Sequence, residues 1–256
     1  MRIDQLLVQR GLASTRSQAQ RLIADGVEWQ HNAQWRRVAK NGDEVPEDAQ
    51  VRLLDDSEAR YVSRGGLKLE AALRALGLSV QGWTCLDVGQ STGGFTDCLL
   101  QSGAALVVGV DVGSAQLHPS LRSHPRVLCV EGINARALTA EDLVEASAGR
   151  ADFTPAFDLI VADLSFISQT LVLPAVVPLL KPGGTLLTLV KPQFELQPPQ
   201  VGKGGIVKDA ALYATVETRL RNACADLGLD VTAWLDSPIA GGDGNREFLM
   251  CATHAG

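Results

Sequence analysis

Between residue 83 and the C-terminus, short apolar runs typical of β-strands alternate with segments of helical periodicity. We expect strands at 84–88, 105–110, 126–130, 157–162, 184–190, 230–235 and 248–252. Helices fit between them at 93–103, 115–123, 139–147, 166–180 and 208–227. Strands that alternate with helices pair in parallel, with helices on both faces of the sheet. This alternation predicts a Rossmann-like α/β fold. The last two strands lack a helix between them, so one of them should run antiparallel.

The first 58 residues have the pattern of a small α+β domain. Apolar residues at helical spacing predict helices at 3–10 and 15–25. Ser14 and Thr15 are suitable N-caps for the second helix, and Gly26 is a suitable stop. Three short strands should follow, at 27–30, 35–38 and 51–54. A further helix is expected at 65–77, before the first strand of the large sheet.

This helix-helix-hairpin unit resembles the S4 RNA-binding domain. The resembling residues are 2–7, 15–16, Ala19, 22–23, 26–27 and 43–45. The resemblance covers residues 1 to about 55 and implies a module that binds RNA. It departs at the hairpin turn, where the family usually has Asn-Gly and this chain has Asn32-Ala33. Because alanine tolerates positive φ less well than glycine, the sequence leaves the geometry of this hairpin open.

Charge is distributed unevenly over the N-terminal region. Residues 1–40 hold seven Arg and Lys against three acids, a net of +4, and residues 41–58 hold one base against seven acids, a net of −6. The whole chain carries −6, which argues weakly against a nucleic-acid partner, but a basic arm can still present one positive face. On charge alone, a solvated surface without a partner is equally compatible. We predict an S4-like domain at 1–58, a linker at 59–64 and an α/β domain at 65–256.

Several classes of protein are disfavoured. The N-terminus carries charges every few residues, unlike a signal peptide, and the longest apolar stretch, 171–180, is about half the ~20 residues of a membrane span. None of the five cysteines forms a C-x-x-C pair, and the four histidines do not cluster. We therefore expect reduced thiols, no metal site, no membrane insertion and a cytoplasmic location.

A glycine-rich turn follows the first strand of the large sheet, at residues 89–94. Such turns lie where folds of this class bind nucleotides. The spacing of Gly89 and Gly94 equals that of a P-loop, in which Lys and then Ser or Thr follow the second glycine. Here Phe95 stands in the place of that lysine, and Thr96 follows it. The dinucleotide fingerprint needs a second glycine where this chain has Gln90-Ser91. The P-loop and the dinucleotide-binding interpretations are therefore disfavoured. A purely structural role, in which the turn only packs a helix, is disfavoured as well.

S-adenosylmethionine fits this turn better, because it has no phosphate but has an amino-acid end and a ribose. Asp87 ends the strand and is suited to the ammonium, or lies beneath the loop. Asp111 ends the next strand, 22 residues after Gly89, where a carboxylate can accept both ribose hydroxyls. The predicted cofactor-binding residues are Asp87, Gly89, Ser91, Thr92, Gly93, Gly94, Phe95, Asp111, Val112, Asn134 and Asp163.

Four further charged positions are candidates for catalysis. Asp163 and Lys191 each follow an apolar strand directly, and strand carboxyl ends form the ligand crevice of open α/β sheets. An ionised group directly after a buried strand needs a partner, so these two are the stronger candidates. Lys68 lies in the helix before the first strand, and Glu247 precedes the last strand. Taken singly, each of these two is more often a surface charge.

The order Lys68, Asp163, Lys191, Glu247 resembles the K-D-K-E tetrad of FtsJ-like ribose 2′-O-methyltransferases. The surrounding residues resemble the TlyA family, whose members carry an S4 domain and are described as ribosomal RNA methyltransferases or hemolysins. These residues are 61–65, 91–96, 111–113, 134–136, 162–168, 190–195, 201–205 and 244–245. The resemblance covers nearly the whole chain. It implies methylation of a ribose 2′-hydroxyl in ribosomal RNA, at a cytidine, with S-adenosylmethionine as donor.

The resemblance also implies roles for the tetrad. Lys191 would lie nearest to the 2′-oxygen, as a neutral base or as a cation that stabilises the developing alkoxide. Lys68, a second cation close by, would favour the base role by repulsion. Asp163 would orient Lys191 and face the sulfonium, and Glu247 would hold Lys68 or the ribose. Gln90 departs from the family, which commonly has alanine there, and its longer side chain is expected to crowd the methionine end of the cofactor.

Ribosomal RNA is the expected partner. Between the two subunits, the sequence weakly favours RNA of the large subunit as the target. The predicted RNA-binding residues are Arg2, Arg10, Arg16, Arg21, Arg64 and Lys203. Arg64 and residues 59–62 are expected to couple RNA docking to cofactor binding. A non-catalytic RNA-binding or ribosome-assembly protein with a degenerate enzyme domain is the main alternative, and Gln90 is its best support. A membrane-lytic toxin and an oxidoreductase are less favoured, the toxin because the sequence has no strongly amphipathic exposed helix.

Overall fold

The computed structural model describes residues 1–13, 15–54, 59–147 and 153–254. The chain forms two compact units, residues 1–67 and residues 68–256. The expected N-cap Ser14 lies outside the described residues, as do residues 55–58 of the expected first domain. The predicted division into a domain at 1–58, a linker at 59–64 and a domain at 65–256 stays a prediction.

The first unit pairs two helices with a three-stranded sheet. Helices α1 (Ile3–Gln9) and α2 (Arg16–Gly26) precede strands β1 (Val27–His31), β2 (Gln34–Arg37) and β3 (Val51–Leu53), and the sheet order is β2-β1-β3. The expected N-cap is confirmed, since the Thr15 side chain accepts a hydrogen bond from the amide of Gln18. The side chains of both helices that face the sheet are buried, and they form the core of this unit.

The hairpin between β1 and β2 forms although its turn lacks glycine. His31 pairs with Gln34, which leaves a two-residue turn of Asn32 (φ 49°) and Ala33 (φ 64°). Two positive φ values are the geometry of a type I′ turn, whose twist matches that of the strands. The hairpin thus holds Ala33 in the left-handed region that asparagine and glycine enter more readily.

The second unit is built on a seven-stranded sheet of order β6-β5-β4-β7-β8-β10-β9. The strands are β4 (Thr84–Val88), β5 (Leu106–Asp111), β6 (Val127–Glu131), β7 (Phe157–Asp163), β8 (Leu180–Val190), β9 (Leu229–Asp236) and β10 (Phe248–His254). The strands from β4 to β8 pair in parallel, whereas β10 is antiparallel to both β8 and β9. The expected α/β fold with one reversed strand among the last two is confirmed.

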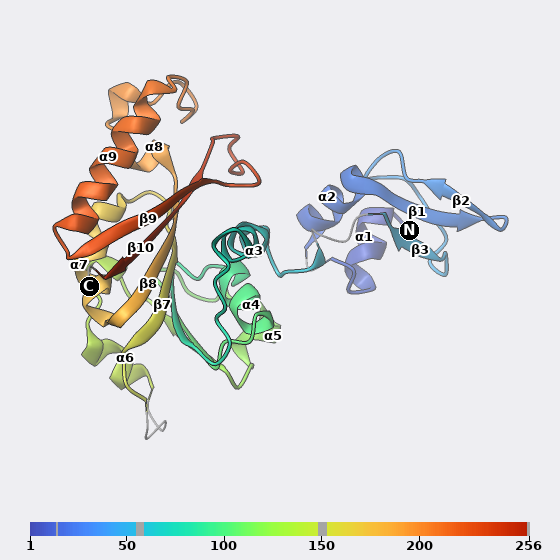
Figure 1. Cartoon of the computed structure of the whole chain (residues 1–256). Coiled ribbons are helices and arrows are strands. Elements are labelled where there is room, and N and C mark those ends of the chain that lie inside the picture. The colour runs from blue at the N-terminus through green and yellow to red at the C-terminus, as the bar shows by residue number, and fades with distance from the viewer. Residues whose placement is uncertain (14, 55–58, 148–152, 255–256) are drawn as a thin grey trace. The chain divides into compact units, whose positions relative to one another are not determined.

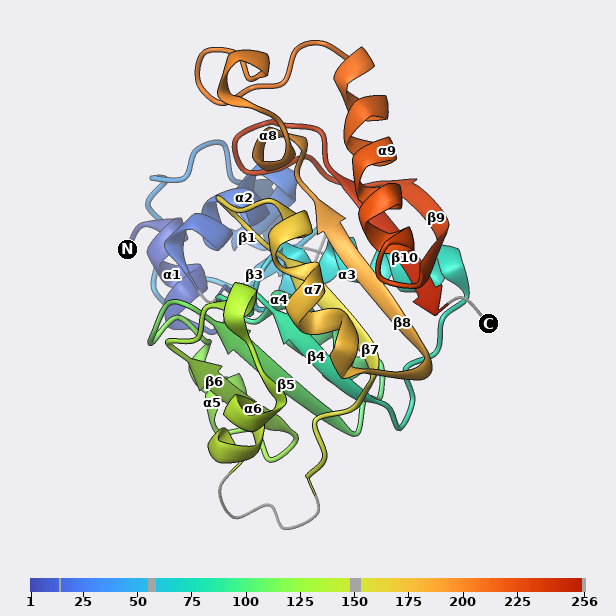
Figure 2. The same cartoon turned by 90° about the vertical axis from the view of Figure 1, so that its left-hand side faces the viewer.

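Helices cover both faces of this sheet (Figures 1 and 2). One face is covered by α3 (Gly65–Leu76), α4 (Gly94–Gln101) and α5 (Pro119–Arg122), and the other by α6 (Ala140–Ala146), α7 (Leu173–Val176) and α9 (Ala211–Ala225). Strands β4, β5 and β7 are buried on both faces along most of their length, as a doubly covered parallel sheet requires. Within the described part of the chain, every helix is too short or too polar to serve as a transmembrane span.

Two expected helices are shorter than the sequence pattern suggests. The segment 166–180 is not one helix but a series of three short ones: η3 (Gln169–Leu171), α7 and η4 (Val177–Leu179). Pro174 and Pro178 explain the breaks, because each removes a backbone donor and clashes with the preceding turn. The expected helix at 115–123 is reduced to α5, which begins at Pro119.

Three further short helices had not been expected. They are η2 (Ala135–Ala137), α8 (Pro192–Glu195) and η5 (Pro198–Gln200). The five cysteines are thiols rather than disulfides, and all but the half-buried Cys129 are buried.

Candidate active site

The glycine turn after β4 presses against the carboxyl end of β7. Gly89 has a φ of 82°, and a β-carbon there would lie 2.6 Å from the carbonyl oxygen of Asp163. Only glycine satisfies both the positive φ and the close approach. Since Val88 pairs with Ala162, the residues that follow these two strands lie side by side at one edge of the sheet.

A chain of buried polar groups supports this turn from below. The amide nitrogen Nε2 of Gln90 donates to the hydroxyl of Thr96 at 2.8 Å, and this hydroxyl donates to Oδ2 of Asp87 at 2.6 Å. Burial raises the pKa of Asp87 to about 7, against the opposing effect of the Thr96 hydrogen bond. Among the described residues, Oδ1 of Asp87 has no hydrogen-bond partner.

Gln90, the residue that departs from the resembling family, is directed into the protein. A β-carbon on Gly109 of β5 would lie only 2.0 Å from the amide group of Gln90. Gln90 is buried over this glycine and does not line the cavity described next. Its predicted crowding of a cofactor therefore finds no support in the position of its side chain.

A cavity of about 410 Å³ opens at the carboxyl ends of β4, β5 and β7. Six predicted cofactor-binding residues line it: Gly89, Ser91, Asp111, Val112, Asn134 and Asp163. The carboxylate of Asp111 accepts the backbone amides of Ser91 and Gly113, each at 2.7 Å, and thereby joins the loops after β4 and β5. Because a carboxylate oxygen has two lone pairs, each oxygen of Asp111 can accept one more hydrogen bond.

Five predicted cofactor-binding residues do not line the cavity: Asp87, Thr92, Gly93, Gly94 and Phe95. Asp87 lies in β4, Thr92 and Gly93 lie in the turn, and Gly94 and Phe95 begin α4. A β-carbon on Gly93 would lie 2.5 Å from the side chain of Leu121, so this glycine lets the α5 segment pack closely. Phe95 is buried in the core.

Several residues that line the cavity had no role predicted from the sequence. Gln116, Ser165 and Phe166 are the polar or aromatic ones among them. Ser165 and Phe166 lie two and three residues after Asp163, so their position directly beyond a strand end was a usable signal. Gln116 lies in the loop after β5, five residues beyond the last residue of that strand, so its distance from the strand end gave no such signal.

Lys191 and Asp163 meet at the edge of this cavity. The ammonium Nζ of Lys191 forms an ion pair with Oδ1 of Asp163 at 2.6 Å and donates a hydrogen bond to Oγ of Ser165 at 2.9 Å. The two charged side chains keep 14% and 25% of their surfaces exposed. Asp163 is the last residue of β7 and Lys191 directly follows the neighbouring parallel strand β8, so the sheet itself brings them together.

Lys68 and Glu247 form a second, deeper ion pair. Nζ of Lys68, on α3, donates to Oε2 of Glu247, and their side chains are only 8% and 2% exposed. Phe248 of β10 pairs with Val190 of β8. Because these strands are antiparallel, Glu247 lies beside Lys191 at the same edge of the sheet. The four predicted catalytic residues therefore form two pairs, each of one lysine and one carboxylate.

Comparisons with known proteins agree with this geometry. The family model for FtsJ-like methyltransferases matches residues 61–254, and the S4 domain model matches residues 1–26. The chain is 43% identical over 249 residues to the 16S/23S rRNA (cytidine-2′-O)-methyltransferase TlyA of Mycobacterium tuberculosis, covering 97% of this chain and 88% of the relative. This chain belongs to the TlyA family of FtsJ-like methyltransferases.

Solved structures agree with the assignment to the TlyA family. A protein from Streptococcus thermophilus described as a hemolysin matches with a TM-score of 0.74 and 39% identity, covering 100% of this chain and 88% of that one. A Listeria monocytogenes protein described as an S-adenosylmethionine-dependent methyltransferase matches with a TM-score of 0.52 and 17% identity, covering 74% of this chain and 100% of that one. At this low identity, the second match shows the methyltransferase fold alone.

In this TlyA-family chain, a buried carboxylate fastens the segments that carry Lys191 and Asp163. Glu195, at the end of α8, accepts the backbone amide of Gln169 at 2.7 Å and the hydroxyl of Ser168 at 2.5 Å. Burial raises the pKa of Glu195, and these hydrogen bonds oppose that rise. The loop after Asp163 is thus fixed to the helix that follows Lys191.

A buried asparagine holds the loop in front of Glu247. The side chain of Asn245 accepts the amide of Val207 at 3.0 Å and donates to the carbonyl of Gly205 at 2.9 Å. It thereby joins the segment before β10 to the glycine-rich segment 201–205. Lys203, a predicted RNA-binding residue, is exposed on this second segment.

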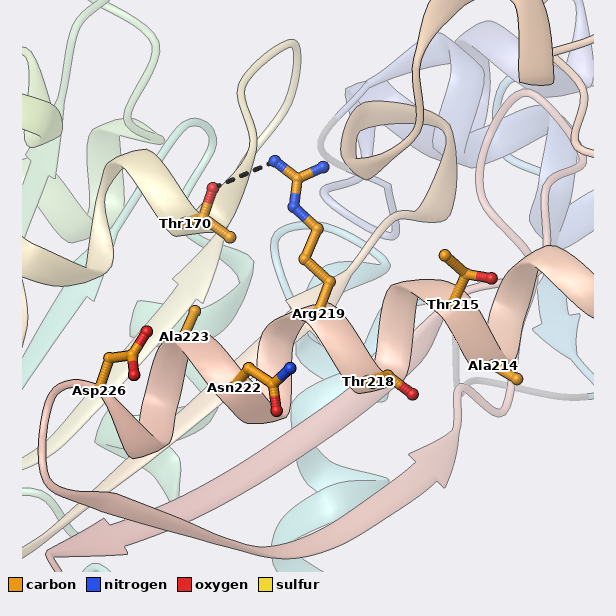
Figure 3. A pocket seen from close by; sticks show the side chains of 8 residues that line it. All are labelled: Thr170, Ala214, Thr215, Thr218, Arg219, Asn222, Ala223 and Asp226. Atoms are coloured by element: carbon orange, nitrogen blue, oxygen red, sulfur yellow. Dashed lines mark hydrogen bonds between the residues drawn. The ribbon is translucent and has the colours of Figure 1, made fainter.

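A shallow groove of about 690 Å³ is lined mainly by residues of α9. Figure 3 shows the side chains that line it. Arg219 crosses it, and its guanidinium donates to the carbonyl of Glu195 at 2.6 Å and to the hydroxyl of Thr170 at 3.5 Å. None of the predicted site residues lines this groove. Arg219 therefore connects α9 with α8 and η3, and the groove is not the methyltransferase cavity.

The predicted RNA-binding arginines of the first unit differ in their contacts. Arg2 and Arg16 both pair with the fully buried Asp4, at 3.0 and 2.9 Å, and remain about half exposed. The hydrogen bond from Arg2 lowers the pKa of Asp4 well below its usual range. Arg10 donates to the carbonyls of Glu47 and Ala49, each at 2.5 Å. These three guanidinium groups have structural contacts in addition to any contact with RNA.

The remaining two predicted RNA-binding residues are half-buried. Arg21 lies on α2, and Arg64 directly precedes α3. RNA binding by Arg21 and Arg64 stays a prediction, as does RNA binding by Arg2, Arg10, Arg16 and Lys203.

Proposed function

We propose that this chain transfers a methyl group from S-adenosylmethionine to a ribose 2′-hydroxyl of ribosomal RNA, at a cytidine. The observation that carries the proposal is the Lys191–Asp163 ion pair at the edge of the cavity. A ribose hydroxyl is a very weak acid, so the transfer needs a group that handles its proton or its developing charge. The M. tuberculosis relative is named for methylating cytidine 2′-oxygens of 16S and 23S rRNA, which supports the same substrate class here.

The residues present in the cavity fit S-adenosylmethionine. Its volume of about 410 Å³ lies within the usual range for ligand pockets. The spare lone pairs of Asp111 suit two ribose hydroxyls, while the carboxylate of Asp163 suits the cationic end. Val112 and Ile133 provide apolar surface for a purine. When bound, the cofactor supplies an electrophilic methyl group on a sulfonium centre.

The two ion pairs receive different roles in this proposal. Lys191 lies nearest to the attacking 2′-oxygen, and its ammonium stabilises the negative charge on that oxygen while water takes up the proton that the hydroxyl loses. Asp163 and Ser165 fix the position of Nζ, through the contacts at 2.6 and 2.9 Å. Lys68 and Glu247 hold α3 against the start of β10 and set the electrostatic surroundings of Lys191. Residues of the cavity that orient the ribose hydroxyl toward the bound donor would lower the activation free energy further, by up to ~7–11 kcal/mol in the best cases.

We assign RNA recognition to the S4-like unit together with Arg64 and Lys203. Contacts from Arg2, Arg16 and Arg21 to phosphates would give affinity without reading sequence. Each neutralised phosphate should contribute roughly −0.7 to −0.9 to the log–log slope of binding against salt. The double use of Arg2 and Arg16 fits this role, because pairing with Asp4 holds their guanidinium groups in place and leaves about half of each exposed.

The decisive experiment maps 2′-O-methylation at nucleotide resolution in ribosomal RNA. RNA from a deletion strain should lack a methyl group on one or more cytidines that the parent strain carries. Complementation with the wild-type gene should restore the modification, and complementation with Lys191→Ala should not. Identical maps from the parent and the deletion strain would reject the proposal.

Isothermal titration with S-adenosylmethionine separates an enzyme from a non-catalytic RNA-binding protein. We expect saturable binding with one site per chain. RNA binding without any cofactor binding would instead support the ribosome-assembly alternative.

A further inference from the structure

Glu195 carries a carboxylate into the interior of the second unit, where the residue is only 3% exposed. In the described part of the chain, the groups that donate to this carboxylate are uncharged: the backbone amide of Gln169 and the hydroxyl of Ser168. The guanidinium of Arg219 donates to the backbone carbonyl of Glu195 instead. A buried carboxyl group without a paired charge opposes folding, and an apolar residue of similar size would avoid that cost. The carboxylate therefore suggests a purpose other than stability.

Glu195 joins the two segments that carry the accessible ion pair. On one side it ends α8, four residues after Lys191, which is the N-cap of this short helix. On the other side it binds Ser168 and Gln169, which follow the end of β7. Gln169 adds a third hydrogen bond, because its Nε2 donates to the carbonyl of Leu189 in β8 at 2.8 Å. We call the three residues Ser168, Gln169 and Glu195 the clamp.

The sheet by itself fixes only part of the geometry of the accessible pair. Asp163 is the last residue of β7, and Lys191 lies directly beyond β8, where the ladder of backbone hydrogen bonds ends. Residues 164–167 belong to no helix or strand, and among them Ser165 accepts the hydrogen bond from Lys191. Since a lysine side chain is long and flexible, an accessible ion pair holds one geometry only weakly. The clamp fixes this loop at its far end and so limits the positions open to Nζ of Lys191.

We infer that Glu195 is a positioning residue for methyl transfer, which holds the segments of Lys191 and Asp163 in the arrangement that the reaction requires. The inference rests on the proposed function. Glu195 is buried and does not line the cavity, so it acts through the residues at the cavity and not by touching the substrate. A misplacement of about 1 Å at a reacting group can lower a rate by roughly 10²-fold. Loss of the clamp should therefore lower kcat more than it weakens binding.

Methyl transfer to ribosomal subunits from a deletion strain tests this role. The rate is measured at saturating S-adenosylmethionine and expressed per cofactor-binding site, counted by isothermal titration. Glu195→Ala should lower kcat by roughly 10- to 100-fold and leave KM for subunits within about threefold of the wild type. Glu195→Gln should restore kcat to within about threefold, because its amide oxygen can accept from Gln169 and its amide nitrogen can donate to Ser168. Glu217→Gln, which removes the partner of Arg221 on α9, is the matched control and should equal the wild type.

A double-mutant cycle separates positioning from general damage to the fold. In the Lys191→Met background, Glu195→Ala should lower the residual kcat by less than about threefold, because the group that the clamp positions is gone. General damage would lower kcat by the same factor in both backgrounds. Should Glu195→Ala fail to fold, Ser168→Ala takes its place, since it removes one hydrogen bond of the clamp at a half-buried position. Its smaller loss, about 2- to 10-fold, should likewise vanish in the Lys191→Met background.

Each failure has its own meaning. If the wild type methylates subunits and Glu195→Ala equals it, the positioning role is rejected while the proposed function stands. Equal losses in both backgrounds would also overturn the inference, as would a loss confined to KM. A Glu195→Gln variant as slow as Glu195→Ala would assign the effect to the charge instead of the hydrogen bonds and reject the clamp. If the wild type itself does not methylate subunits, the proposed function fails first.

Discussion

The two lysine–carboxylate pairs at the carboxyl edge of the sheet differ mainly in burial. Lys191 and Asp163 retain 14% and 25% exposure and line or adjoin the cavity, whereas Lys68 and Glu247 retain 8% and 2%. The accessible pair joins neighbouring parallel strands. The buried pair joins residues 179 positions apart in the sequence. One lysine–carboxylate pair thus lies at the edge of the cavity and the other in the core.

Burial changes what an ion pair contributes. A buried pair gains little net stability over apolar residues of similar size, but removing one partner leaves an uncompensated charge in the interior. An accessible pair contributes little to stability because water and salt screen it. From this difference we expect substitutions at the buried pair to affect folding first. Substitutions at the accessible pair should affect chemistry first.

The largest effect is expected from breaking the buried pair on one side. Lys68→Met should lower the free energy of unfolding by about 3–5 kcal/mol, because Glu247 would remain charged and buried without its partner. Urea unfolding followed by far-UV circular dichroism measures this change. Arg74→Ala, which removes the exposed partner of Glu70 on the same helix, is the matched control and should change stability by less than about 0.5 kcal/mol.

The double variant Lys68→Met/Glu247→Leu sharpens this test. It should regain much of the lost stability, because no isolated charge remains in the interior. If it also regained full methylation activity, the buried pair would serve folding alone and its assigned electrostatic role would be wrong.

The next largest effect is expected at the accessible pair. Lys191→Met should lower kcat by about 10²–10³-fold through loss of charge stabilisation, with a melting temperature close to that of the wild type. Methyl transfer from labelled S-adenosylmethionine to ribosomal subunits measures the rate. Lys181→Met is the control, since Lys181 pairs with Asp158 at 2.8 Å at the opposite end of β8. Equal activity of the two variants would contradict the assigned role of Lys191.

This comparison also shows what the sequence could predict. Asp163 and Lys191 were predictable as neighbours, because each directly follows an apolar strand and parallel strands end at one edge of the sheet. The pairing of Lys68 with Glu247 was expected only from the family resemblance, as one of two alternatives, because it depends on how α3 packs and on the register of β10 against β8. Sequence periodicity reveals neither.

Two features of local structure that the sequence did not reveal have simple physical origins. The expected helix at 166–180 was predicted from its apolar character, although Pro174 and Pro178 within it were evidence for a break. The direction of the Gln90 side chain depends on Gly109 on a neighbouring strand, 19 residues away in the sequence. Such a contact becomes visible only once the strands are paired.

A third prediction concerns Asp87, a buried carboxyl group that is not paired with a lysine in the described structure. Burial raises the pKa of Asp87 from 3.8 to about 7, so between these pH values the folded chain binds a proton that the unfolded chain has lost. Protonation of Asp87 therefore adds to the free energy of unfolding fully below about pH 4, less as the pH rises, and not at all above about pH 7. Across this range the free energy of unfolding should fall by an amount on the order of 2–4 kcal/mol.

Asp87→Asn should remove this dependence, because asparagine does not titrate. Urea unfolding of the wild type and the variant at pH 5 and pH 8 measures it, and the difference between the two proteins should shift in favour of the variant at the higher pH. An unchanged difference would mean that the carboxylate of Asp87 has a partner which compensates its charge.

The smallest effect is expected at Ser165, which accepts a hydrogen bond from Lys191 at 2.9 Å. Since Ser165 is exposed, water can replace its hydroxyl, and we expect Ser165→Ala to lower kcat by about 2- to 10-fold without changing stability. Ser165→Thr, which keeps the hydroxyl, should restore most of the rate. A loss as large as that of Lys191→Met would mean that the hydroxyl itself contacts the reacting ribose. Lys191 and Ser165 would then both act on the reacting ribose hydroxyl.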